Sequence, residues 1–440
     1  MTFPVSPGNG DTYLAADGKV YEYNSSEARW KILELSAARI QTKNVESPAG
    51  DGSDDGKFVM WSKPWDMFIL NNPNQSAPFL GSTLMFGGLS NFTGAIDRSE
   101  AMAYTWGRNS SGQLGINNRN DQSSPVSVMG GHSFVQICAG ESHFVALDVN
   151  GQAWCWGWNQ RGQLGDGTLT ASSTPVSVVG NYKFVSIGCG ATQSFGIDES
   201  GHLWAWGHSN YGQCGTGFAP NNFSSPQSVL GNHSFIQATG GNWWSAAVRG
   251  DGVCMCWGDN RFANLGNAPG NQTDHKSSPI SVSGTQGYKQ VACGAYHALG
   301  LKRDGTLYAW GTNDFGELGI GNKGTSTTRP PTSVLDNHLF SQVACGEYHS
   351  FGIDTNGSAW SWGSQVNGSL GAGAVNDQSS PISVFGGHSY IAIAGRLGGG
   401  IALINDGTMY SWGSGSNGQI GNNSTSGTQN SPVLVVKTFE

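Results

Sequence analysis

Side chains capable of chemistry recur in this 440-residue sequence in one short segment, which follows a Cys-Gly or similar pair. The segment ends in His143, His297 and His349 in three copies, and two of these copies also carry Glu141 or Glu347. A histidine beside a carboxylate could perform acid–base catalysis or bind a metal ion. Aromatic and arginine side chains, which other copies carry, are instead typical anchors of protein interfaces. Whether these side chains perform chemistry or bind a protein depends on how the surrounding strands and loops position them.

The copies differ from one another at these positions, and residues that vary between repeats are free of the demands of the fold. The set that we predict to form a binding face is Glu141, His143, Gln193, Trp243, Trp244, Tyr296, His297, Glu347, Tyr348, His349 and Arg396. A structural role is the alternative for the histidines, because a histidine at this position can also hydrogen-bond the neighbouring repeat.

The segment belongs to a long internal repeat that is marked by the pair Trp-Gly. The tryptophans of these pairs are Trp106, Trp156, Trp206, Trp257, Trp310, Trp362 and Trp412, which follow one another at intervals of 50 to 53 residues. A Gly-rich turn such as GQLG follows each pair, and a Pro-led run comes next. A period near fifty indicates stacked units that cover one another's apolar faces.

Each unit contains four short runs with the alternation of β-strands, separated by Gly, Pro and Asn residues that would interrupt a helix. Four strands per unit are typical of a propeller blade. The predicted fold is therefore all-β, a seven-bladed β-propeller over residues 81–440. The last copy lacks a strand, and residues 82–88 resemble the missing one. We therefore expect the N- and C-terminal strands to share a blade and close the ring.

In such a ring all copies of one loop emerge on one face, around the central channel. Three histidines spread around a ring, with only scattered carboxylates among them, do not form a catalytic or metal-binding arrangement. We predict no enzymatic activity, no metal and no cofactor. The eight cysteines occupy repeat positions that other copies fill with small or apolar residues, so we expect structural thiols rather than disulfides.

The repeat resembles a known family. The pattern WGxNxxGQLG, with G-x-x-H before it and Ser-Pro after it, resembles the regulator of chromosome condensation repeat over roughly residues 81–440. The resemblance implies a seven-bladed propeller. It does not imply one function, because similar propellers serve as a guanine nucleotide exchange factor, a photoreceptor, an enzyme inhibitor and interaction modules.

The N-terminal part differs from the repeats. Residues 10–33 alternate apolar and polar side chains around a turn at Asp17-Gly18, which predicts a small three-stranded meander. This stretch resembles short modules of bacteriophage tail and fibre proteins. We assign residues 1–48 to this module, with a role in attachment and possible homo-oligomerisation, and residues 49–80 to a linker or docking segment.

Composition limits the partners. Charged residues make up 12% of the chain, and the formal net charge is −8. Without a basic run or a long apolar stretch, neither nucleic acid nor membrane insertion is expected. The leading hypothesis is a virion structural protein, a phage tail or surface fibre that binds a host receptor (protein or glycan) or a neighbouring virion protein. The alternative is a cytoplasmic scaffold or inhibitor of the same propeller family. A guanine nucleotide exchange factor ranks below both, because the repeat spacing leaves no room for an inserted wedge.

Overall fold

The computed structural model describes two compact units, Met1–Leu70 and Asn71–Glu440. The described residues are the strands at 12–14, 20–24, 29–32 and 83–84, and residues 90–436 except 98–99, 220, 268–274, 285–286, 325–327, 336, 374 and 426. Apart from the first three strands, the predicted attachment module (1–48) and linker (49–80) lie outside the described residues.

Three antiparallel strands form the described part of the first unit. They are β1 (Thr12–Leu14), β2 (Val20–Asn24) and β3 (Arg29–Ile32), in the order β1-β2-β3. Tyr13 is paired with Tyr21, and Tyr23 with Trp30. The three-stranded meander predicted from the alternation of residues 10–33 is thereby confirmed.

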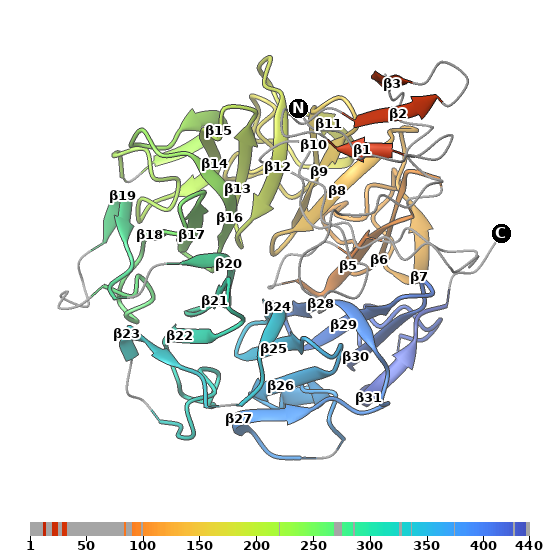
Figure 1. Ribbon diagram of the computed structural model, residues 1–440. Coiled ribbons are helices and arrows are strands. Elements are labelled where there is room, and N and C mark those ends of the chain that lie inside the picture. Colours follow the sequence, from red (N-terminus) through yellow and green to blue (C-terminus); the bar gives the residue numbers. More distant parts are fainter. Residues whose placement is uncertain are drawn as a thin grey trace. The chain divides into compact units, whose positions relative to one another are not determined.

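Seven four-stranded antiparallel sheets, all within the described residues, form the second unit and follow one another around a ring (Figure 1). Blade 1 contains β4 (Thr83–Leu84), β5 (Phe92–Asp97), β6 (Met102–Gly107) and β7 (Gln122–Ser127). Blade 2 contains β8 (Phe134–Ala139), β9 (His143–Asp148), β10 (Ala153–Gly157) and β11 (Ser172–Ser177). Blade 3 contains β12 (Phe184–Cys189), β13 (Gln193–Asp198), β14 (Leu203–Ser209) and β15 (Asn221–Ser228).

The remaining blades repeat this order. Blade 4 contains β16 (Phe235–Gly240), β17 (Trp244–Arg249), β18 (Cys254–Gly258) and β19 (Lys276–Ser281). Blade 5 contains β20 (Tyr288–Cys293), β21 (His297–Lys302), β22 (Leu307–Gly311) and β23 (Thr328–Ser333). Blade 6 contains β24 (Phe340–Cys345), β25 (His349–Asp354), β26 (Ala359–Gly363) and β27 (Gln378–Ser383), with a short 3-10 turn η2 (Val366–Gly368). Blade 7 contains β28 (Tyr390–Arg396), β29 (Gly399–Ile404), β30 (Met409–Ser414) and β31 (Thr428–Leu434). The all-β seven-bladed propeller is confirmed.

The Trp-Gly pair ends the third strand in five blades and lies one or two residues before its end in blades 7 and 3, and its glycine is required by the backbone. In blade 2 the pairing of β10 with β11 shifts register between Cys155 and Gly157. Gly157 has φ +103°, and a Cβ there would lie 2.5 Å from the carbonyl oxygen of Ser142. Only glycine adopts this conformation without strain and also permits so close a backbone approach. The repeated glycine therefore lets the third strand pair with its neighbours while the chain turns into the following loop.

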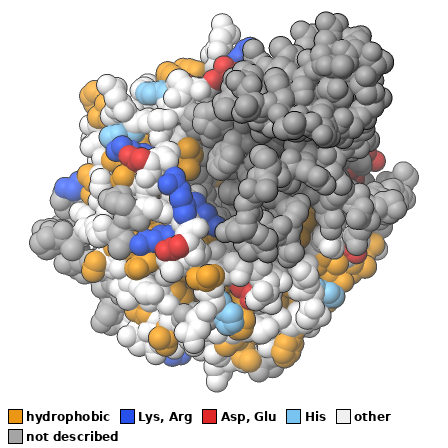
Figure 2. Space-filling model, in the orientation of Figure 1, with side chains coloured by type: hydrophobic (Ala, Val, Ile, Leu, Met, Phe, Trp, Pro, Cys, Tyr) orange, Lys and Arg blue, Asp and Glu red, His pale blue; other side chains and the backbone are white. Residues whose placement is uncertain are grey.

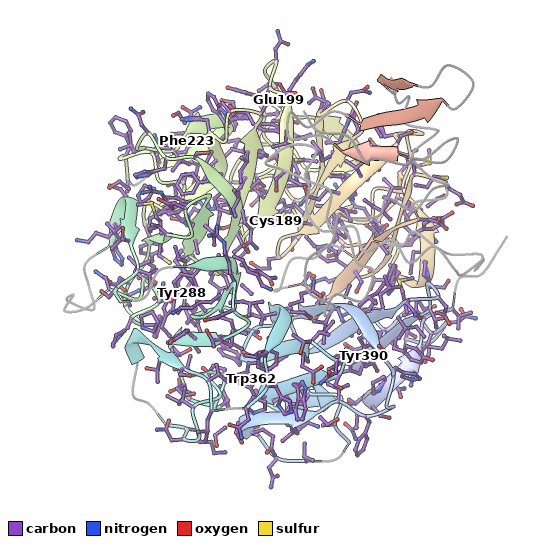
Figure 3. All side chains as sticks on the ribbon, in the orientation of Figure 1. Cys189, Glu199, Phe223, Tyr288, Trp362 and Tyr390 are labelled. Atoms are coloured by element: carbon purple, nitrogen blue, oxygen red, sulfur yellow. The ribbon has the colours of Figure 1, made fainter. Side chains whose placement is uncertain are left out.

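The tryptophan of each pair holds two blades together. Trp206 is fully buried, in a cluster with Phe184 and Leu164, and its Nε1 donates a hydrogen bond to the Gln163 carbonyl oxygen of the preceding blade (3.0 Å). Figure 3 shows Trp362 among the side chains that fill the ring. The same bond joins blade 1 to blade 7, where Trp106 Nε1 donates to the Gln419 carbonyl oxygen (3.2 Å). Each tryptophan combines a large buried apolar surface with a satisfied polar group.

Glutamines of the innermost strands form a second link between blades. Gln136 Nε2 donates to the Ile187 carbonyl oxygen (3.1 Å), and Gln136 Oε1 accepts from the Ile187 backbone N–H (3.0 Å). Gln237 and Gln290 make the same pair of bonds with Val291 and Val343. The side-chain amide thus acts as a peptide group where the innermost strands of neighbouring blades do not themselves pair.

The closure of the ring differs from the prediction. β4 pairs with β5 in blade 1, and β31 pairs with β30 in blade 7, so the terminal strands do not share a blade. A blade does not begin where the sequence repeat was taken to begin. The strand that follows each Pro-led run is the first, innermost strand of the next blade, so the last blade, which ends with its Pro-led strand, is complete. Contacts between side chains and loops, including the bond from Trp106, replace the expected shared sheet.

The cysteines agree with the prediction of structural thiols. All eight are free and buried. Burial among apolar neighbours raises the pKa of the Cys155 thiol well above its ordinary value, and that of Cys214 to about 12. Both therefore remain protonated at neutral pH and contribute as small apolar side chains.

Candidate functional site

The predicted binding residues lie in or beside one set of loops, which we call the channel loops. They join the first and second strands of blades 2 to 7 and comprise residues 140–142, 190–192, 241–243, 294–296, 346–348 and 397–398. Backbone hydrogen bonds link successive loops, from Glu141 to Ala191 (2.8 Å), from Ala191 to Gly241 (3.1 Å) and from Ala295 to Glu347 (3.1 Å). Together with the bond from the Asn242 backbone N–H to the Ala295 carbonyl oxygen (3.2 Å), these bonds connect the channel loops of blades 2 to 6.

Six of the eleven predicted residues are buried, and the structure corrects the expectation that the face displays them. They are His143, Gln193, Trp244, His297, His349 and Arg396. The first five open the second strand of their blade, and this position points into the contact with the next blade. The alternative that the sequence left open for the histidines, a hydrogen bond to the neighbouring blade, is what the structure contains.

The histidines use the same atom for this bond. His143 Nε2 lies 2.9 Å from Ser194 Oγ, and His297 Nε2 lies 2.9 Å from Ser350 Oγ. Since each serine hydroxyl donates to a backbone carbonyl, the histidine Nε2–H must be the donor. His349 Nε2 donates directly to the Gly399 carbonyl oxygen (3.1 Å). All three imidazoles therefore carry their proton on Nε2 and join two blades.

Burial keeps these imidazoles neutral. Loss of solvation lowers the pKa of His143 to about 3, and loss of solvation together with the nearby His349 lowers that of His297 to about 3. Burial lowers the pKa of His349 to about 4. A side chain with such a pKa and a fixed structural hydrogen bond is not placed to exchange protons with a substrate. In the described part of the chain, no group of three or more His, Cys, Asp or Glu side chains is arranged to hold a metal ion.

Gln193 and Trp244 join their blades to the next one, whereas Arg396 makes its bonds within blade 7. Gln193 Nε2 donates to the carbonyl oxygens of Gly241 (3.2 Å) and Trp244 (3.0 Å), and Trp244 Nε1 donates to that of Ala295 (3.0 Å). Arg396 is 2% exposed and donates to three acceptors. These are the Gln419 carbonyl oxygen (2.9 Å), the Trp412 carbonyl oxygen (2.6 Å) and Ser411 Oγ (3.1 Å). Burial lowers the pKa of Arg396 to about 9.

The other five predicted residues, Glu141, Trp243, Tyr296, Glu347 and Tyr348, are accessible to solvent. Glu141, Trp243 and Glu347 line one hollow of about 260 Å³. The channel loops of blades 2, 3, 4, 6 and 7 contribute to its wall, together with Asn91 and Arg108 of blade 1. The hollow is therefore the mouth of the central channel, and we call it the channel mouth.

Two carboxylates give the channel mouth its charge. Partial burial raises the pKa of Glu141, and the Arg108 guanidinium lowers it in part. Burial also raises the pKa of Glu347, a hydrogen bond from the Tyr348 hydroxyl lowers it in part, and the Glu141 carboxylate raises it. Among the described residues, no lysine, arginine or histidine lies within ion-pair distance of either carboxylate. Two partly desolvated acids that repel each other therefore face the same hollow.

Aromatic rings continue from the channel mouth across blades 3 to 6 in what we call the aromatic arc, namely Tyr211, Trp243, Phe262, Tyr296, Phe315 and Tyr348. Ring centroids are 5.8 Å apart for Tyr211 and Trp243, 5.7 Å for Trp243 and Tyr296, 4.4 Å for Phe262 and Tyr296, and 5.3 Å for Phe315 and Tyr348. Tyr296 and Tyr348 also pack against the buried Ala191 and Ala295. All six rings are partly exposed.

Arg261 belongs to this surface, and sequence reasoning missed it. Its guanidinium lies 5.0 Å from the ring centroids of both Tyr211 and Trp243, and it forms an ion pair of 3.0 Å with the buried Asp259. His275 Nδ1 lies 3.1 Å from the same carboxylate. The available signal was the loop sequence of blade 4, WGDNRFANLG, in which Ala263 replaces the glycine that the other six copies have.

Charges elsewhere are mixed. On the face that Figure 2 shows, basic and acidic side chains lie beside each other in small groups. Arg249 and Asp251 (2.6 Å), and Lys323 and Asp377 (3.6 Å), are ion pairs of this kind. Within the described residues, no helix combines the length and apolar character needed to cross a membrane.

The sequence and the ring place the chain in a family of proteins. Six segments match the regulator of chromosome condensation (RCC1) repeat, at residues 101–147, 150–197, 200–248, 251–301, 304–353 and 406–440. A second form of the same repeat matches residues 134–163, 288–317 and 340–369. The first set covers more than half of the chain, so this protein belongs to the RCC1-repeat family.

Individual relatives match over part of the chain. The probable E3 ubiquitin-protein ligase HERC3 of Homo sapiens is 29% identical over 154 residues, which are 34% of this chain and 14% of that protein. The ultraviolet-B receptor UVR8 of Arabidopsis thaliana is 34% identical over 139 residues, 31% of each chain. Both matches span well under two thirds of the relative. The structure of Prp20p from Saccharomyces cerevisiae superposes with a TM-score of 0.68 at 21% identity, covering 76% of this chain and 86% of that one, which shows a shared fold.

Proposed function

We propose that this protein is a non-enzymatic interaction scaffold that binds a protein partner at the channel mouth and aromatic arc. The observation that carries the proposal is the row of partly exposed aromatic side chains from three adjacent blades, Trp243, Tyr296 and Tyr348. Aromatic anchors on a rigid support lose little conformational entropy on binding and dominate the energetics of protein interfaces. The linked channel loops of blades 2 to 6 supply that support.

The relatives support a protein partner. The yeast propeller is described by its binding properties to Gsp1p and histones. HERC3 is named a probable ubiquitin-protein ligase. The described residues of the present channel face hold their histidines in neutral structural bonds, so we assign this face to binding and not to catalysis.

Photo-crosslinking tests the proposal directly. A photoreactive phenylalanine analogue at Trp243 and, separately, at Tyr348 should capture the same protein from an extract of the source. The matched control is Phe385, an aromatic residue that is 55% exposed and follows β27 at the end of blade 6. The same analogue at Phe385 should not capture that protein.

The captured protein is then purified and its affinity measured. Combined Trp243→Ala and Tyr348→Ala changes should weaken binding by about 30-fold or more, since an anchor residue contributes about 2 kcal/mol. Phe385→Ala should leave the affinity unchanged. Equal binding by the double variant and the native chain would refute the proposed face.

The virion hypothesis rests on the likeness of residues 10–33 to phage fibre modules, on the low charge and on the abundance of Ser, Asn, Thr and Gly, whereas the relatives above come from human, plant and yeast. The scaffold is therefore the function that we propose, with localisation in the cytoplasm. Mass spectrometry of purified virus particles and of host lysate tests it, because a stoichiometric band in intact particles would restore the virion role.

Light scattering of the full chain and of a chain without residues 1–48 tests oligomerisation through that module.

A further inference from the structure

We propose that the partner docks by placing one lysine or arginine side chain between Glu141 and Glu347, with neighbouring apolar residues on Trp243, Tyr296 and Tyr348. This inference rests on the proposed function and adds the chemistry of the partner: a short basic segment that also carries large apolar side chains. Charge and shape at the channel mouth both favour this occupant.

The charge argument begins with the two carboxylates. Glu141 and Glu347 line one hollow and interact unfavourably with each other, while burial removes part of their solvation. Arg108 compensates Glu141 and the Tyr348 hydroxyl compensates Glu347, each only in part. A cation placed between the two acids would relieve their repulsion and replace the lost solvation. An anionic partner would meet an added repulsion.

The shape argument concerns the wall of the hollow. Trp243 lines the mouth on the side of blade 4, and Tyr296 and Tyr348 continue the apolar surface over blades 5 and 6. The aliphatic stem of a lysine or arginine can lie against an aromatic ring while its charged end reaches the carboxylates. Flanking apolar residues of the same segment would then lie on the two tyrosines.

The chain contains its own example of this chemistry. Beside the channel mouth the Arg261 guanidinium lies against Tyr211 and against Trp243, which also lines the mouth, and it is paired with the carboxylate of Asp259. Aromatic faces and a carboxylate there hold a cation that belongs to the protein. At the channel mouth the aromatic face and two carboxylates are present, and no cationic side chain of the described residues pairs with them.

A peptide library displayed on phage, selected against the immobilised full chain, tests the inference without knowledge of the partner. Enriched peptides should carry a lysine or arginine next to aromatic or aliphatic residues. A synthetic copy of the best peptide should bind at least tenfold more weakly to the Glu141→Gln, Glu347→Gln double variant, and more weakly in 0.5 M than in 0.05 M sodium chloride. Replacing its basic residue by norleucine should remove both effects.

Glu199→Gln is the matched control. Glu199 is an exposed carboxylate in the turn between β13 and β14, at the opposite end of β13 from the channel loop, and it lies at the periphery of the ring in Figure 3. The control variant should bind the peptide as the native chain does.

The outcomes separate the two proposals. Peptides that lose affinity on Trp243→Ala but not on the double glutamine change, or that lack a basic residue, would overturn the cation inference and leave the proposed face standing. Peptides that bind independently of both sets of changes would overturn the proposed face as well. Loss of affinity with both sets, and not with Glu199→Gln, would support both proposals.

Discussion

Adjacent residues of the channel loops differ in burial and in role, and Trp243 and Trp244 show this most clearly. Trp244 opens β17, is fully buried and donates a hydrogen bond to the next blade. Trp243 precedes it, is partly exposed and lines the channel mouth. Successive residues of an extended chain point in opposite directions, so one tryptophan faces the neighbouring blade and the other faces solvent. Stability and binding are therefore assigned to alternate residues of one short segment.

The largest predicted difference in stability is between the alanine variants of these two tryptophans. Trp244→Ala removes a fully buried indole and should lower the free energy of unfolding by about 3–5 kcal/mol. Trp243→Ala should lower it by less, about 1–2 kcal/mol, because that ring is partly exposed and its contacts are with the partly exposed side chains of Tyr211, Tyr296 and Arg261. Urea denaturation of both variants measures the difference. Equal losses would show that the two positions are not separated as described.

The pH dependence of stability tests the buried histidines. Their folded-state pKa values of about 3 to about 4 lie below the unfolded value near 6.5. The stability that each contributes is therefore complete above pH 6.5 and is lost as the pH falls towards the folded-state pKa. The loss should be about 1.4 kcal/mol per pH unit for each histidine.

His297→Gln should remove one of these contributions. Gln193 shows that a glutamine at the equivalent position can bond the next blade through Nε2. The variant should retain most of its stability at pH 7 and lose stability less steeply than the native chain between pH 6 and pH 4. Urea midpoints across this range, compared between the two chains, provide the measurement. Identical slopes would mean that His297 titrates normally in the folded protein.

Glu317 offers a smaller effect in the same region. It is fully buried, burial raises its pKa, and its Oε1 has no hydrogen-bond partner. A carboxyl group whose folded-state pKa is raised destabilises the fold as the pH rises above the unfolded value. Glutamine occupies the equivalent position as Gln113, where Oε1 accepts from a backbone N–H as Glu317 Oε2 does. Glu317→Gln should therefore raise the free energy of unfolding at pH 7 by about 1 kcal/mol. The gain should vanish near pH 4, and a loss of stability at pH 7 would contradict the argument.

Much of the fold, and less of the site, could be predicted from the sequence. The repeated Trp-Gly pair determines a blade locally, because its glycine is needed within the same sheet. Which residues of a channel loop are buried depends on contacts made 51 residues away, as between His143 and Ser194. Arg261 meets Tyr211 and Trp243 only because three loops converge. The length of the repeat also does not show which strand begins a blade, and this decides how the ring closes.

The smallest effect on the free energy of unfolding is expected at the carboxylates of the channel mouth, which we assign to binding and not to stability. Glu141 and Glu347 precede the blade-joining positions, make no ion pair with the described residues and repel each other. Changing both to glutamine should therefore shift the free energy of unfolding by no more than about 0.5 kcal/mol, and upwards. The same double variant should lose at least tenfold in affinity for a basic peptide. A residue pair that is neutral for folding and required for binding is what separates a recognition site from a structural one. A marked loss of stability in this variant would instead place the two acids with the buried histidines, as part of the structure that joins the blades.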